Sequence, residues 1–215
     1  MRIIQVSADY FKSQHLEAAT TMLEKGEVIA FPTDTAYELG VDITNEEAVQ
    51  KLQNIKQRYG EGELPLVLLG SSKEMLLPYV LDWTPLAEKL SIDFWPGGLT
   101  MILKKSFKVP DYAVNKLDTV GIRVPNHPVI LKILEEYGKP IAVSSANISG
   151  LSSSNTGRRV SEELDESELA LLLDAGRTPE TEPDTIVDIS KDEPILLREG
   201  IISAEKLLMD FAIIL

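Results

Sequence analysis

Residues 30–40 read Ala30-Phe31-Pro32-Thr33-Asp34-Thr35-Ala36-Tyr37-Glu38-Leu39-Gly40. The apolar residues that lead into this stretch predict the end of a buried strand, and the proline stops that strand because it has no N–H for the ladder. The polar residues that follow then lie at a strand exit, where ligand sites of mixed α/β proteins tend to lie. A plain hydroxyl- or Asx-type turn between two elements is the alternative at this point.

Around this stretch the chain alternates between amphipathic and apolar segments. Apolar residues at helical spacing predict helices over residues 14–25, 44–58, 72–79, 84–94, 128–137, 157–164 and 203–209. Apolar runs predict strands over residues 3–6, 27–31, 65–69, 99–103, 119–124, 140–144, 169–174, 185–189 and 195–198. Thr44 followed by Glu47 is a capping-box pattern for the second helix. Because the alternation lacks strict βαβ order, we expect one α/β domain over residues 1–215, with an open, twisted, mixed sheet and flanking helices.

Composition limits the possible partners. The chain has 215 residues, 44% of them apolar, and no cysteine, so disulfides and thiolate metal sites are excluded. It has no run of eighteen apolar residues and no signal-peptide pattern, which predicts a cytoplasmic protein without a membrane partner. The net charge of −13 repels nucleic acid as a whole, so a polyanion would have to bind at a local cationic pocket.

Polar clusters recur at the predicted element ends. Besides Thr33-Asp34-Thr35 they are Lys56-Gln57-Arg58, Gly121-Ile122-Arg123-Val124-Pro125 and Ser144-Ser145-Ala146-Asn147, with Arg198 at a later strand end. Lys and Arg match phosphate or carboxylate oxygens, and Ser and Asn add neutral donors. Lys56 and Arg58 converge only where the helix has ended or unwinds, and a buried Arg123 requires an anionic partner. The clusters predict an anion pocket.

Other site patterns are missing from the sequence. No Walker, G-x-G-x-x-G, G-x-S-x-G or H-E-x-x-H motif occurs. The two histidines have no partner at metal-ligand spacing, so we expect no protein metal site.

Seven motifs, taken in order, resemble the YrdC-like family. They are Phe31–Gly40, Lys56-Gln57-Arg58, Trp95–Thr100, Arg123-Val124-Pro125, Ser145–Gly150, Asp184–Asp188 and Arg198-Glu199-Gly200. The resemblance covers the chain from about Glu27 to Gly200 and is to the single-domain form. It implies a twisted open α/β sheet with a concave, cationic cleft.

The family consists of threonylcarbamoyl-AMP synthases, so the resemblance also implies a reaction. L-threonine and bicarbonate form N-carboxythreonine, whose carboxylate attacks the α-phosphate of ATP, and threonylcarbamoyl-AMP and pyrophosphate leave. Mg²⁺ is expected with ATP. The product serves the modification of adenosine 37 in tRNA, which implies contact with RNA or tRNA and with downstream threonylcarbamoyl-transfer proteins as partners.

The resemblance assigns roles to residues by their position in the motifs. Lys56, Arg58, Ser145 and Asn147 resemble the catalytic set around the triphosphate of ATP. The residues that resemble contacts to threonine are Thr33, Arg123, Thr185 and, through its backbone, Val143. Those that resemble further contacts to ATP are Thr119, Ser153 and Arg198.

The chain departs from the family pattern at three places. Glu38 replaces a glycine, Asp184 stands where a serine is common, and the loop over residues 59–64 is lengthened. Two other functions stay open beside the synthase. One is an RNA-binding or ribosome-associated module that uses the same cleft, and the other is a related carbamoyl- or acyl-adenylate-forming enzyme with a different acceptor.

Overall fold

The computed structural model describes residues 1–7, 10–58, 65–147, 153–164, 167–179 and 182–214, except for the side chains of Gln57 and Arg58. The strands are β1 (Arg2–Gln5), β2 (Ile29–Pro32), β3 (Tyr37–Asp42), β4 (Val67–Leu69), β5 (Leu99–Lys104), β6 (Thr119–Arg123), β7 (Ile141–Ser145), β8 (Leu171–Asp174), β9 (Thr185–Asp188) and β10 (Ile195–Arg198). The helices are α1 (Ser13–Glu24), α2 (Glu46–Arg58), α3 (Lys73–Leu76), α4 (Pro85–Phe94), α5 (Pro128–Tyr137), α6 (Gly157–Glu163) and α7 (Ala204–Phe211), with short 3₁₀ turns at Leu77–Tyr79 and Asp111–Ala113.

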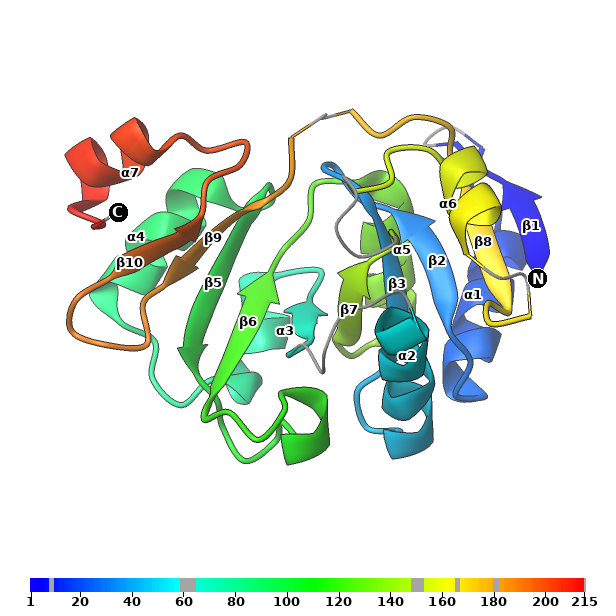
Figure 1. Cartoon of the computed structure of the whole chain (residues 1–215), viewed down its shortest axis with the longest axis horizontal. Coiled ribbons are helices and arrows are strands. Elements are labelled where there is room, and N and C mark those ends of the chain that lie inside the picture. The colour runs from blue at the N-terminus through cyan, green and yellow to red at the C-terminus, as the bar shows by residue number, and fades with distance from the viewer. Residues whose placement is uncertain (8–9, 59–64, 148–152, 165–166, 180–181, 215) are drawn as a thin grey trace.

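All ten of these strands join one open sheet in the order β1-β8-β2-β3-β7-β4-β6-β5-β9-β10 (Figure 1). The pairs β1/β8, β2/β8, β4/β6 and β5/β9 are parallel, and the other neighbours are antiparallel. The predicted α/β fold with an open mixed sheet is therefore confirmed. The sheet brings β3, β7, β4 and β6 side by side in its centre, although residues 37 and 123 are far apart in the chain.

Apolar faces of the helices pack against the sheet in two cores. One core contains side chains of α1 and α5, among them Leu23 and Ile133. The other contains side chains of α2, α4, α6 and α7, among them Leu52 and Leu90. In Figure 1, α2 and α6 lie in front of the sheet and α5 lies behind it. The helical spacing of apolar residues thus identified the buried faces correctly, because burial of those faces is what stabilises short helices.

The strand β3 was missing from the prediction. The turn after Pro32 ends at Ala36, and the chain then pairs Tyr37 with Pro32 and continues antiparallel to β2. Tyr37 and Leu39 are fully buried among apolar side chains, whereas Glu38 and Gly40, which alternate with them, point to the other face of the sheet. Glu38 and Gly40 hid this alternation, because neither residue favours a strand.

The predicted capping box at Thr44 was also wrong. Asn45 caps α2 instead, since its side-chain oxygen accepts a hydrogen bond of 3.0 Å from Ala48 N. The backbone N and hydroxyl of Thr44 donate to Asp42 Oδ1 at 2.8 and 2.7 Å. Asp42 therefore engages the hydroxyl that the capping box required, and the helix begins one residue later at Glu46.

The helices of the described residues include none that is both long enough and apolar enough to span a bilayer. The expected lengthening of the loop over residues 59–64 falls outside the described residues.

Candidate functional site

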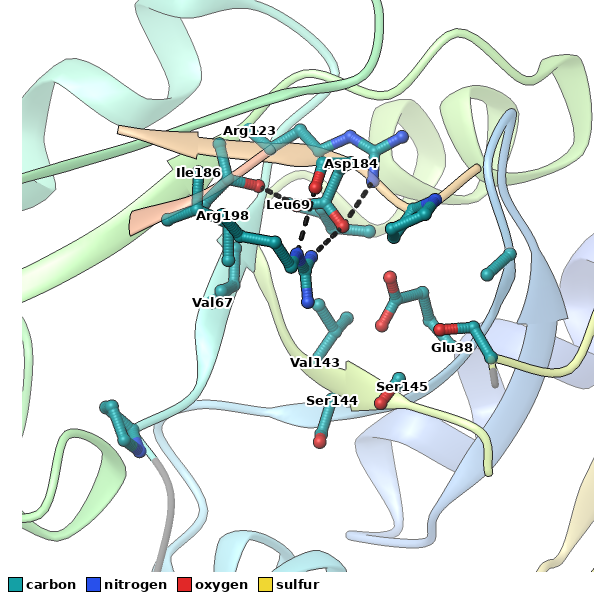
Figure 2. Close-up of a pocket in the computed structure, with 15 residues that line it drawn as sticks. Glu38, Val67, Leu69, Arg123, Val143, Ser144, Ser145, Asp184, Ile186 and Arg198 are labelled. Atoms are coloured by element: carbon teal, nitrogen blue, oxygen red, sulfur yellow. Dashed lines mark hydrogen bonds and ion pairs between the residues drawn. The ribbon is translucent and has the colours of Figure 1, made fainter. Parts of the chain in front are cut away.

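A cavity of about 230 Å³ lies over the centre of the sheet (Figure 2). Side chains two apart on a strand share one face, so Val67 and Leu69 of β4 line it together. The neighbouring strands add charged and polar residues. These are Glu38 of β3, Ser145 of β7, Arg123 of β6, Thr100 of β5 and Arg198 of β10, with Asp184 just before β9. The fold thus collects charged side chains from distant parts of the sequence around one apolar floor.

Asp184 is the centre of the charged group in this cavity. Its Oδ1 lies 2.5 Å from Arg198 Nη2, and its backbone oxygen accepts from Arg198 Nε at 3.0 Å. Its Oδ2 accepts a hydrogen bond of 2.5 Å from the Thr100 hydroxyl. Arg123 Nη1 lies 3.8 Å from the same Oδ1. Two arginines and a threonine therefore share one carboxylate, as the dashed lines of Figure 2 show for Arg198.

Arg123 is 1% exposed and is held from several sides. Its Nη2 donates to Asp34 Oδ1 at 2.7 Å, and its Nε donates to Gly97 O at 3.0 Å. The sequence required an anionic partner for this arginine, and the protein supplies two of them, Asp34 and Asp184. The guanidinium is therefore fixed in place before any ligand arrives.

Glu38 is the carboxylate in the cavity that has no such partner. The residue is 8% exposed, and within the described part of the chain its carboxylate accepts no hydrogen bond and forms no ion pair. Figure 2 shows its carboxylate aimed into the cavity, toward the Asp184–Arg198 pair. Burial, together with the negative charge of Asp184, raises the pKa of Glu38 to about 7, although Arg123, Arg198 and Lys56 act in the opposite direction.

Lys56 lies beside the cavity and supports one of its walls. Its ammonium donates to Ser145 O at 2.8 Å and to Asn147 O at 2.9 Å, and the residue is 3% exposed. These bonds hold the segment that follows β7. The helix α2 includes both Lys56 and Arg58, so it does not end or unwind before Arg58, as their convergence would need. The side chain of Arg58 lies outside the described residues.

The backbone of Tyr37 holds two further segments of the site. Its N–H donates to Ser154 O at 2.8 Å, and its carbonyl accepts from Ala146 N at 2.9 Å. The segment that leaves Ser145 and the segment that returns at Ser153 are therefore attached to the same residue. Both serines line the cavity.

Two predicted threonine contacts have their hydroxyls inside the protein. Thr33 accepts from the N–H groups of Thr35 and Ala36 and donates to Ala36 O at 2.7 Å, which makes the turn after β2 a hydroxyl-stabilised turn. Thr185 donates to Ile202 O at 2.9 Å and is fully buried, as is Thr33. Both side chains stabilise backbone close to the cavity.

The predicted site residues thus fall into two groups. Arg123, Val143, Ser145, Ser153 and Arg198 line the cavity. Among the residues that the structure describes, those that were predicted but do not line the cavity are Thr33, Lys56, Thr119, Asn147 and Thr185. Thr119 begins β6 opposite Lys104, and Asn147 is 6% exposed. Thr100 belongs to the Trp95–Thr100 motif but was given no role in the site, although a polar residue between Leu99 and Met101 in an apolar strand is a usable signal.

No group of three or more His, Cys, Asp or Glu side chains suited to a metal ion occurs among the described residues. Asp184 and Glu38 are both in the cavity, but Asp184 already has three side-chain partners.

Comparison with known proteins gives consistent matches. The family model for Sua5, YciO and YrdC, described as "Telomere recombination", matches residues 21–200. The threonylcarbamoyl-AMP synthase of Pyrococcus abyssi is 34% identical over 96% of this chain and 60% of its own length, and that of Vibrio parahaemolyticus is 35% identical over 86% and 99%. The crystal structure of P. abyssi Sua5 complexed with L-threonine superimposes with a TM-score of 0.92 and 33% identity, covering 100% of this chain and 62% of that one.

Proposed function

Because this chain belongs to the Sua5/YciO/YrdC family, as its sequence motifs indicated, we propose that it is a threonylcarbamoyl-AMP synthase, a nucleotidyltransferase. Its substrates are L-threonine, bicarbonate and ATP with Mg²⁺, and its products are threonylcarbamoyl-AMP and pyrophosphate. The product serves the modification of adenosine 37 of tRNA in the cytoplasm, through threonylcarbamoyl-transfer proteins and contact with RNA. The chain spans 60% of the length of the P. abyssi relative and 99% of the Vibrio one.

One observation carries this proposal. Residues assigned to threonine (Arg123, Val143) and residues assigned to ATP (Ser145, Ser153, Arg198) line the same cavity, although they come from four separate parts of the chain. A synthase must bring the carboxylate of N-carboxythreonine against the α-phosphate of ATP. A shared cavity supplies that proximity, which turns a reaction between two separate molecules into an effectively unimolecular step.

The residues around the cavity suit the electrostatics of the reaction. Attack of a carboxylate on a phosphate brings two anions together, so cations and fixed donors must offset their repulsion. Arg123, held by Asp34, offers a fixed guanidinium to the amino-acid carboxylate. Arg198 is 44% exposed and lies beside the serines, where it can turn toward a phosphate. Lys56 fixes the segment that carries Ser145 and Asn147 by binding its carbonyls.

The experiment is a substrate panel. The protein is incubated with MgATP, bicarbonate and each standard amino acid in turn, and pyrophosphate is followed. Release that depends on both threonine and bicarbonate supports the synthase. Release with a different amine supports the second candidate, an enzyme with another acceptor, which the cavity carboxylate of Glu38 favours. No release with any amine, combined with retention of RNA, supports the RNA-binding module instead.

A further inference from the structure

Glu38 stands directly beside the serine assigned to ATP. In the antiparallel pairing of β3 with β7, Glu38 is opposite Ser145, and such pairs have Cβ atoms about 5 Å apart. Both residues line the cavity. A group bound by Glu38 therefore lies within reach of the place where the acyl phosphate bond would form.

The charged groups that face Glu38 leave its carboxylate without a cation. Asp184 repels it, and the three cations nearby, Arg123, Arg198 and Lys56, are bonded to other acceptors. Glu38 is 8% exposed and lines the cavity, so its carboxylate, which no protein group pairs, is open to a donor from a ligand bound there.

The donor must be a cation with N–H groups that enters the cavity. An amino acid carries such a group, because its α-amine is an ammonium at neutral pH. Its carboxylate would lie toward Arg123 of β6, which lines the same cavity and is separated from β3 in the sheet by β7 and β4. Asp184 cannot replace Glu38 in this role, since both of its carboxylate oxygens already have partners.

We propose that Glu38 binds the ammonium group of the amino-acid substrate and accepts a proton from it, which frees the amine for carboxylation. This inference rests on the synthase function proposed above. It makes Glu38 a catalytic residue that the family motifs do not assign, because the family pattern has glycine at its position.

Every proton in this step has a donor and an acceptor. An ammonium has no lone pair, so it cannot attack carbon. Transfer of one N–H proton to the Glu38 carboxylate leaves the neutral amine and a carboxylic acid. The amine nitrogen then forms a bond to the carbon of bicarbonate, and water leaves with the oxygen of the broken C–O bond and two protons, giving the N-carboxylate. The proton on Glu38 returns to solvent. A carboxyl group with a pKa of about 7 suits this exchange, because it titrates near the working pH.

The ammonium contact is tested by ligand binding, without turnover. Calorimetry at pH 8 compares threonine with 2,3-dihydroxybutanoate, in which a hydroxyl replaces the ammonium. Wild-type protein is expected to prefer threonine by about tenfold to a hundredfold, the usual strength of a charged hydrogen bond. Glu38→Gln should lose most of this preference, whereas Glu38→Asp, which keeps the carboxylate, should keep it in part. Glu17→Gln, the same change at an exposed position on α1, should match wild type.

The proton transfer is tested by the pH profile of threonine-dependent pyrophosphate release. In wild type the rate should rise with pH through about 7, and Glu38→Gln should lose this inflection together with about tenfold or more in kcat/KM. The proposal would be overturned if Glu38→Gln kept both the wild-type preference for threonine and the wild-type pH profile of pyrophosphate release. It would also be overturned if the wild-type protein bound threonine and 2,3-dihydroxybutanoate equally well. Preference for threonine without any pyrophosphate release would instead refute the synthase function and leave the ammonium contact standing.

Discussion

Arg123 and Asp34 form a buried ion pair that joins the centre of the sheet to the turn after β2. Their atoms Nη2 and Oδ1 are 2.7 Å apart, and the two side chains are 1% and 9% exposed. Asp34 Oδ1 also accepts the backbone N–H of Asn126 at 2.9 Å. The aspartate of the Thr33-Asp34-Thr35 cluster therefore positions an arginine of the cavity, and its own role is structural.

Removing the carboxylate of this pair should be strongly destabilising. In Asp34→Ala the guanidinium of Arg123 stays buried with less compensation, so we expect the free energy of unfolding to fall by about 3–5 kcal/mol. Denaturant unfolding measures the loss. Asp111→Ala is the matched control, since it breaks an ion pair with Lys105 in which the aspartate is exposed, and it should change stability little. Equal losses in the two variants would contradict this view of the pair.

Glu38 should make stability depend on pH in a defined window. Its pKa is about 7 in the folded protein, above the ordinary value of 4.5, so the folded state holds more protons than the unfolded state between these values. The free energy of unfolding should therefore fall as pH rises from about 4.5 to about 7, by about 3 kcal/mol. Glu38→Gln should remove this contribution and be more stable than wild type at pH 8. Parallel stability curves for the two proteins would show that Glu38 does not titrate in this way.

Lys56 should be needed for order in the segment after β7. Lys56→Met keeps the length of the side chain but loses both bonds to the carbonyls of Ser145 and Asn147. We expect the amide hydrogen of Ala146 to exchange about tenfold faster or more, because charged hydrogen bonds of this kind restrain local opening. The rate of pyrophosphate release should fall in the same variant. Lys51→Met, on the same helix but bonded at the surface to Glu27, should leave the exchange of Ala146 unchanged.

Gly40 should not tolerate a side chain. A Cβ atom there would lie 2.5 Å from Phe31 Cε1 and 2.8 Å from Ile141 Cγ2. Gly40→Ala should therefore lower the free energy of unfolding by about 1–3 kcal/mol through overpacking. Phe31→Leu removes the nearer obstacle, so the double variant should lose less than the sum of the two single variants. Strict additivity would mean that the strain lies elsewhere.

The helices and most strands could be predicted because their buried faces repeat with a fixed period. The strand β3 has the same kind of alternation in Tyr37, Leu39 and Val41, but Glu38 and Gly40 between them read as strand breakers. These two residues face the other side of the sheet. Glu38 lines the cavity there, and Phe31 leaves no room for a side chain at Gly40. A site built into a strand thus obscured the local signal of that strand.

The sequence motifs named residues that the fold gathers around one cavity, whereas their individual contacts could not be predicted. Sequence alone required an anion for Arg123 but could not say whether the protein or a ligand supplies it, because Asp34 lies 89 residues away. The motif assigned Lys56 to ATP, and in the fold its ammonium donates to the backbone carbonyls of Ser145 and Asn147. Carbonyl acceptors have no sequence signature, so contacts of this kind become visible only in the fold.

The two hydrogen bonds of the Tyr37 backbone bear on how this chain can vary in length. Ala146 and Ser154 are both hydrogen-bonded to the backbone of Tyr37, so the segment between them starts and finishes at one residue of the sheet. Residues inserted there would lengthen a segment whose ends are already fixed, and doubling the length of such a connection costs only about 0.6 kcal/mol. An insertion between Pro32 and Tyr37 would instead shift β3 against both neighbouring strands. Length variation among homologues should therefore concentrate between residues 147 and 153, while the spacing from Pro32 to Tyr37 stays constant.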